Sequence, residues 1–161
     1  MTTFTDRPRG AGFPASEQLT GNLQQVLVDL IALHLQAKQA HWNVVGPNFR
    51  DLHLQLDEIV DLARDASDTI AERMRALQAT PDGRAPTVVA SASLTPLPSG
   101  ELASSQVVDL ITVALRTAVA TIRKVHDQVD AEDPSTSDLL HTIINQLEKQ
   151  AWMLSAENRT V

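Results

Sequence analysis

Prolines divide this chain into four long stretches that can each form an uninterrupted helix. Breaks fall at Gly46-Pro47, within residues 79–103, which hold four prolines, and at Asp133-Pro134. Proline lacks an amide hydrogen and clashes with the preceding helical turn, so helices end near such positions. The predicted helices span about residues 16–45, 48–78, 105–131 and 134–157.

Apolar residues recur every three or four positions along these stretches, as they do on one face of a helix. Leu19, Leu23 and Leu30 follow this period in the first stretch. Ser16 and Asn48 stand where they can cap the first two helices, and Asp133 where it can cap the fourth. Residues 79–103 are long for a featureless connection, so we expect a short helix at 87–93. The pattern predicts an all-α four-helix bundle with one long crossover that contains a short helix.

Composition narrows the class of protein. The 161 residues suit one bundle domain over residues 16–161, preceded by a flexible N-terminal tail at 1–15. No apolar run is long enough to span a membrane, and no secretory signal is visible, so no membrane partner is expected. The absence of cysteine fits a cytoplasmic location. The net charge of −7 argues against a generally DNA-attracting surface.

Five side chains that can bind a metal lie between residues 41 and 72: His41, His53, Asp57, Asp68 and Glu72. His53 and Asp57 are four residues apart, as are Asp68 and Glu72, so each pair shares a helical face. His53 and Asp68 are then roughly 22 Å apart along the helix axis, whereas metal ligands lie about 2 Å from the ion. Both pairs can serve one ion only if a second copy of the chain supplies one of them across a two-fold axis.

The chain contains no Glu-x-x-His motif, which would mark a di-iron site inside one bundle. The stretch KQAHWNVVGPNFRDLHLQLDEIVDLARDASDTIAER, residues 38–73, closely resembles the Dps family (DNA-binding proteins from starved cells). These are small ferritin-like proteins that store and oxidise iron. The resemblance implies a ferritin-like fold and places a catalytic, metal-binding ferroxidase centre on the five residues named above.

The resemblance also implies a bacterial homo-oligomer, a dodecameric hollow shell. Fe(II) and hydrogen peroxide or O2 would be its substrates, with ferric mineral stored inside to protect DNA from oxidative stress. Acidic residues before the last helix would line the pores through which iron enters; the candidates are Asp138, Glu132 and Asp133. Glu58 and Asp61 are candidates for mineral nucleation. Trp42 is either a core or interface anchor or a quencher of radicals formed at the iron site.

Two other classes of function stay open. One is a nucleoid DNA-binding protein that compacts and physically protects DNA; only Arg7 and Arg9 make the tail basic, and it has no lysine. The other is a structural helical assembly with a degenerate metal site. His34, His126 and His141 each stand alone in the sequence and receive no role.

Overall fold

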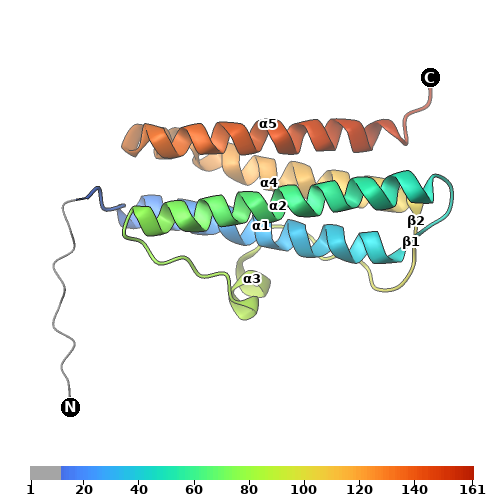
Figure 1. Cartoon of the computed structure of the whole chain (residues 1–161), viewed down its shortest axis with the longest axis horizontal. Coiled ribbons are helices and arrows are strands. Elements are labelled where there is room, and N and C mark those ends of the chain that lie inside the picture. The colour runs from blue at the N-terminus through green and yellow to red at the C-terminus, as the bar shows by residue number, and fades with distance from the viewer. Residues whose placement is uncertain (1–11) are drawn as a thin grey trace, which may run out of the picture.

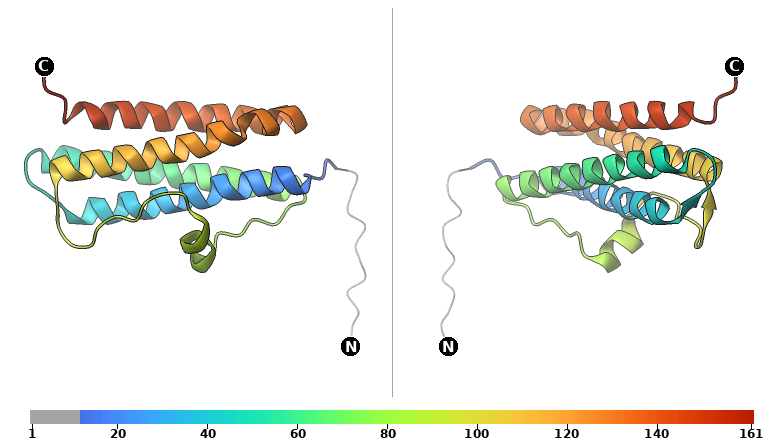
Figure 2. Two further views of the ribbon diagram at one scale, coloured as in Figure 1. Left: turned by 180° about the vertical axis from the view of Figure 1, so that it is seen from behind. Right: turned by 45° about the vertical axis from the view of Figure 1, so that its right-hand side comes forward.

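Four long antiparallel helices form the body of the molecule in a computed structural model that describes residues 12–161 (Figure 1). The expected flexible tail lies outside the described residues up to position 11. The predicted all-α bundle with a helix-containing crossover is confirmed. The helices are α1 (Glu17–Asn43), α2 (Phe49–Ala76), α3 (Ala85–Ser91), α4 (Ser104–Glu132) and α5 (Pro134–Ala156). The helix α3 lies in the crossover and packs against α1, on the side of the bundle away from α5 (Figure 2).

The helices begin where the sequence signals place them, but only one of the three predicted side-chain caps forms, and Asp133 precedes α5 without capping it. The Ser16 hydroxyl accepts a hydrogen bond from the Leu19 amide at 3.0 Å, as a capping residue should. Asn48 does precede α2, but the predicted side-chain cap is wrong. Its backbone is left-handed (φ 59°), and its amide donates to Glu157 Oε2 at 2.9 Å. Asparagine tolerates this conformation, so Asn48 turns the chain and ties it to the end of α5.

Two short strands, β1 (Val44–Val45) and β2 (Leu102–Ala103), were not predicted from the sequence. They pair in parallel, with Val44 opposite Leu102. The break at Gly46-Pro47 leaves the two valines extended, and their backbone groups need partners outside a helix. The pairing fastens the turn between α1 and α2 to the start of α4.

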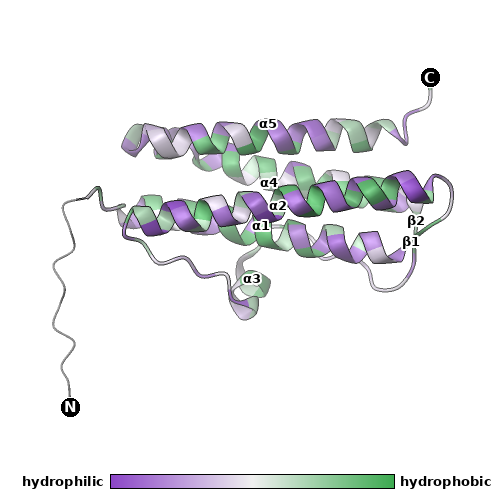
Figure 3. Cartoon of the chain, in the orientation of Figure 1, coloured by the Kyte–Doolittle hydropathy of each residue, from purple (hydrophilic) through white to green (hydrophobic). Residues whose placement is uncertain are grey.

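The core consists of the apolar helix faces; Figure 3 shows hydrophobic and hydrophilic segments alternating along the long helices. Leu23, Leu33, Leu56, Ile70 and Leu115 are fully buried. One helix, α4, is long and apolar enough to cross a membrane, but half of its most apolar window is buried inside the bundle. Core packing therefore accounts for the composition of this helix.

The most deeply buried carboxylate of the described residues belongs to Asp29. Asp29 on α1 is 1% exposed, and its oxygens accept from the Thr121 hydroxyl on α4 at 2.6 Å and the Ser93 amide in the crossover at 2.7 Å. Buried charge is tolerated when it is well hydrogen-bonded. Asp29 therefore joins α1, the crossover and α4.

Candidate metal centre

Two predicted ligands, His41 near the end of α1 and His53 in α2, lie against each other. Their rings stack with centroids 3.6 Å apart and planes inclined by 19°. His41 Nδ1 lies 2.7 Å from the His53 carbonyl oxygen, and His53 Nδ1 lies 2.9 Å from the His41 carbonyl oxygen. A carbonyl only accepts, so each Nδ1 must carry the hydrogen. In the neutral rings, both Nε2 atoms therefore keep a lone pair for a metal.

Helix geometry explains why the His41 carbonyl is available. The His41 carbonyl lies in the last turn of α1, where carbonyl groups lack an intrahelical donor. Phe49, in the first turn of α2, stacks on the other side of His53 with ring centroids 5.2 Å apart. The two imidazoles are thus held in place by backbone and ring contacts.

The third predicted ligand, Asp57, follows His53 by one turn of α2. Its Oδ1 lies 3.5 Å from His41 Nδ1 and 2.6 Å from the ammonium of Lys38. The hydrogen bond from Lys38 lowers the pKa of Asp57 below its usual value of 3.8, so the carboxylate is ionised at neutral pH. Lys38 precedes His41 by three residues, a spacing that places both on one face of α1. This spacing was available in the sequence but was not used to assign Lys38 to the site.

The other two predicted ligands, Asp68 and Glu72, lie farther along α2 and are exposed. The structure therefore brings together His41, His53 and Asp57 but not all five residues. Within residues 12–161, no three His, Asp or Glu side chains are arranged to hold a metal ion.

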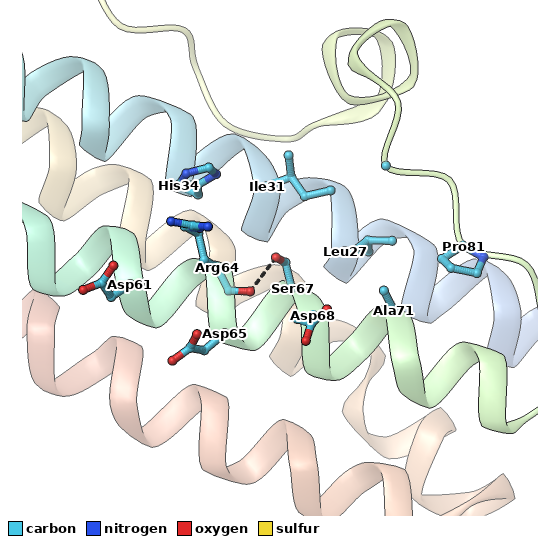
Figure 4. A pocket seen from close by; sticks show the side chains of 11 residues that line it. Leu27, Ile31, His34, Asp61, Arg64, Asp65, Ser67, Asp68, Ala71 and Pro81 are labelled. Atoms are coloured by element: carbon cyan, nitrogen blue, oxygen red, sulfur yellow. Dashed lines mark hydrogen bonds between the residues drawn. The ribbon is translucent and has the colours of Figure 1, made fainter.

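Asp68 lines an open groove of about 620 Å³ between α1 and α2, together with Ile31, His34 and Arg64 (Figure 4). Asp61 and Asp65 line the same groove, which makes its α2 wall acidic. Burial and the positive charges of Arg64 and Lys38 lower the pKa of His34 below 6.5. The lowered pKa means that His34 favours its neutral form. The carboxylates of Asp61, Asp65 and Asp68 are the negative groups that this groove presents.

The pore candidates sit in different environments. Asp133 is only 8% exposed; its carboxylate is 2.7 Å from Arg73 and also accepts from the Thr136 hydroxyl. Burial raises the pKa of Asp133, but the hydrogen bonds from Thr136 and Arg73 outweigh it, and the net pKa is lowered. Glu132 binds Ser16 through both oxygens, whereas Asp138 remains exposed.

Other candidates are found at the surface. Glu58 and Asp61 are exposed on α2. Trp42 is 68% exposed, which excludes the core-anchor interpretation and leaves the interface and radical-quenching ones. Lys38 Nζ lies 6.0 Å from the Trp42 ring centroid.

The interpretation that His126 and His141 stand alone is wrong. Their rings stack across α4 and α5 with centroids 4.4 Å apart. Each histidine is seven or eight residues from Asp133, where the two helices meet. An antiparallel helical hairpin places such residues opposite each other, so the spacing could have predicted the pair.

Comparison with known proteins identifies the family of the four-helix bundle. A family model of the ferritin-like domain matches residues 20–160. The DNA protection during starvation protein of Agrobacterium fabrum is 33% identical over 88% of this chain and 88% of its own length. The chain belongs to the Dps branch of the ferritin-like family.

A Deinococcus radiodurans sequence and a Deinococcus radiodurans crystal structure extend the comparison. DNA protection during starvation protein 2 is 37% identical over 83% of this chain, which spans only 56% of that longer relative. The crystal structure of Dps92 superimposes with a TM-score of 0.87 at 34% identity, covering 90% of this chain and 88% of that one. The ferritin-like fold implied by the sequence is therefore confirmed for the bundle.

Proposed function

We propose that this Dps protein is a ferroxidase that oxidises Fe(II) at sites shared by two subunits and stores the ferric product in a hollow homo-oligomeric shell. The observation that carries the proposal is the reciprocal hydrogen bonding of His41 and His53, which leaves both Nε2 atoms available to a metal. Imidazole and carboxylate donors suit iron, and few protein ligands leave coordination positions open for an oxidant.

The second subunit follows from distance. Asp57 and Asp68 are eleven residues apart on one helix, about 16 Å along its axis. A two-fold axis that crosses α2 between them would bring Asp68 and Glu72 of one copy to the histidines of the other. The acidic groove beside Asp68 would then face the partner's cationic Lys38.

Two groups of residues would hold the iron during the reaction. His41, His53 and Asp57 would bind the first iron, and the partner's Asp68 and Glu72 would complete its coordination and hold a second iron nearby. Two Fe(II) ions each give one electron to one hydrogen peroxide, which takes up two protons and leaves as two water molecules. Pairing the two electrons at one site avoids release of a hydroxyl radical.

Other residues would serve transport and protection. Iron would enter a dodecameric shell past Asp138, with Glu132 and Asp133 nearby, and Glu58 and Asp61 would nucleate the mineral. Asp138 is the most suitable pore residue because its carboxylate is exposed, while Asp133 is occupied by Arg73. Trp42 would donate an electron to any stray radical. We also propose a cytoplasmic location for the protein.

Subunit mixing tests the shared site. We expect His53→Ala and Asp68→Ala each to oxidise Fe(II) no faster than buffer when peroxide is added after anaerobic loading. Co-assembled in equal amounts, the two variants should recover about a quarter of the wild-type rate, since one site in four combines an intact half from each.

A second mixture provides the matched control. His53→Ala mixed with His41→Ala should recover nothing, because both variants damage the same half of the site. Equal recovery in both mixtures, or a wild-type rate in Asp68→Ala alone, would contradict the shared ferroxidase site.

DNA binding is the second candidate, favoured by the name of the relatives, DNA protection during starvation protein. Phosphate-driven binding weakens as salt increases. A gel shift that disappears with added salt would support it, whereas the absence of any shift at low salt would leave iron oxidation as the protective activity.

A further inference from the structure

Lys38 forms an ion pair with Asp57, one of the proposed ligands. Its Nζ is 2.6 Å from Asp57 Oδ1, close to the length of the shortest charge-assisted hydrogen bonds. The same carboxylate oxygen lies 3.5 Å from His41 Nδ1, the ring nitrogen that also contacts the His53 carbonyl. The charge of Asp57 beside the two histidines is therefore already neutralised by a cation belonging to the same subunit.

We propose that Lys38 is a built-in counter-ion for Asp57, displaced when metal binds, that sets how tightly the centre takes up its metal. The proposal rests on the function proposed above. A divalent ion that binds the Asp57 oxygen held by Lys38 would meet the lysine's positive charge and compete with its hydrogen bond. Metal uptake through this oxygen therefore includes breaking the Lys38–Asp57 ion pair.

The exposure of the pair makes such a displacement feasible. The side chains of Lys38 and Asp57 are 30% and 43% exposed, so this is a partly solvated ion pair. Pairs of this kind contribute little net stability. A doubly charged ion with two additional histidine ligands can therefore outcompete the ammonium, while a monovalent ion cannot.

The structure also offers the displaced ammonium another partner. Trp42 follows Lys38 by one helical turn, and Lys38 Nζ is already 6.0 Å from its ring centroid, at the edge of the range for cation–π attraction. Because the indole is largely exposed, the lysine can move onto its face without leaving α1.

The first test measures affinity. Zn(II), which has no redox chemistry, is titrated calorimetrically into the full-length protein and into Lys38→Met, which keeps the length of the side chain but not its charge. We expect Lys38→Met to bind Zn(II) about tenfold more tightly, a change on the scale of outer-shell effects at metal sites. Lys124→Met, which removes an exposed lysine from α4, should bind like the wild type.

A double-mutant cycle identifies the route of the effect. In an Asp57→Asn background, Lys38→Met should no longer improve binding, because no carboxylate remains to be released. Unchanged or weaker Zn(II) binding by Lys38→Met in the native background would overturn the proposal. If Zn(II) binding by the wild type does not depend on His53, both the proposed metal centre and the proposed role of Lys38 are refuted. If the wild type binds Zn(II) through His53 but Lys38→Met has no effect, only the role of Lys38 is refuted.

The second test follows the displacement directly. The chain contains two tryptophans and no tyrosine, so Trp152→Phe leaves Trp42 as the only strong fluorophore. Zn(II) should change the Trp42 emission in this background, and Lys38→Met should abolish the change. An equal change with and without Lys38 would contradict the movement of the ammonium.

Discussion

Each helical hairpin of this Dps protein contains a stacked pair of histidines, and the two pairs differ in what their Nδ1 atoms contact. In the α1–α2 hairpin, the Nδ1 atoms of His41 and His53 face backbone carbonyls. In the α4–α5 hairpin, the Nδ1 of His126 is 3.2 Å from Asp127, and that of His141 is 3.9 Å from Asp138. Among the described residues, the buried Nε2 of His126 has no hydrogen-bond partner.

Helix position explains one of these contacts. His41 is in the last turn of α1, where carbonyls are free to accept from a side chain, and its carbonyl accepts from His53. The carbonyls of His53, His126 and His141 lie within their helices, so the contact from His41 Nδ1 to the His53 carbonyl depends on the close approach of α1 and α2. Within the described residues, the Nδ1 atoms of the α4–α5 pair contact side-chain carboxylates rather than a fixed backbone acceptor that would direct Nε2.

Removing one histidine from each pair should give the largest contrast. We expect His53→Ala to weaken Co(II) binding about 100-fold or more, because it removes a proposed ligand and the ring stacked on His41. His141→Ala should leave the Co(II) affinity unchanged, since neither His141 nor His126 is among the proposed ligands. Anaerobic titration followed by the visible Co(II) spectrum checks both; comparable losses would show that the two pairs are equivalent.

The hairpins are joined through Asp29, and its removal should have the next largest effect. We expect Asp29→Ala to lower the free energy of unfolding by about 2–3 kcal/mol, because the buried Thr121 hydroxyl and the Ser93 amide lose their acceptor. Urea unfolding at a fixed protein concentration measures the loss.

Asp29→Asn provides the control for this prediction. Its amide oxygen keeps one acceptor in the same place, so the loss should be smaller than for alanine. Equal stability of the alanine variant and the wild type would mean that apolar packing alone joins the hairpins.

The smallest expected effect concerns pH. Burial, Arg64 and Lys38 hold the pKa of His34 below 6.5, so the unfolded chain takes up this proton more readily than the folded one. The stability contributed by His34 is present above pH 6.5 and is lost as the pH falls toward the lowered pKa. We expect His34→Gln to lose less thermal stability than the wild type between about pH 7.5 and about pH 5.5. Parallel melting-temperature curves would contradict this assignment.

Much of the bundle could be predicted because its signals are local. Pro47, Pro134 and the proline-rich crossover set the breaks, and the apolar period set the buried faces. The short helix in the crossover was expected at 87–93 and forms at Ala85–Ser91, since Pro86 suits a first helical turn. The candidate ligands could be named for the same reason, as spacings of four residues specify a shared helical face.

The contacts that prepare those ligands could not be predicted, because they join residues distant in the chain or depend on backbone atoms. Lys38 reaches Asp57 across nineteen positions, and Asp29 reaches Thr121 across ninety-two. Asp133 was predicted as a pore residue from its charge, yet its contact with Arg73 depends on how α2 packs beside the α4–α5 corner.

By itself, the sequence determined four helices, their inward faces and a set of metal-capable residues too far apart on one helix for one ion. The tertiary structure decided which nitrogen of His41 and His53 is free, which cation neutralises Asp57 and which acidic residues remain exposed. The reason is that helix formation depends on neighbours within a few residues, whereas a hydrogen-bond partner is chosen by the packing of whole helices against one another.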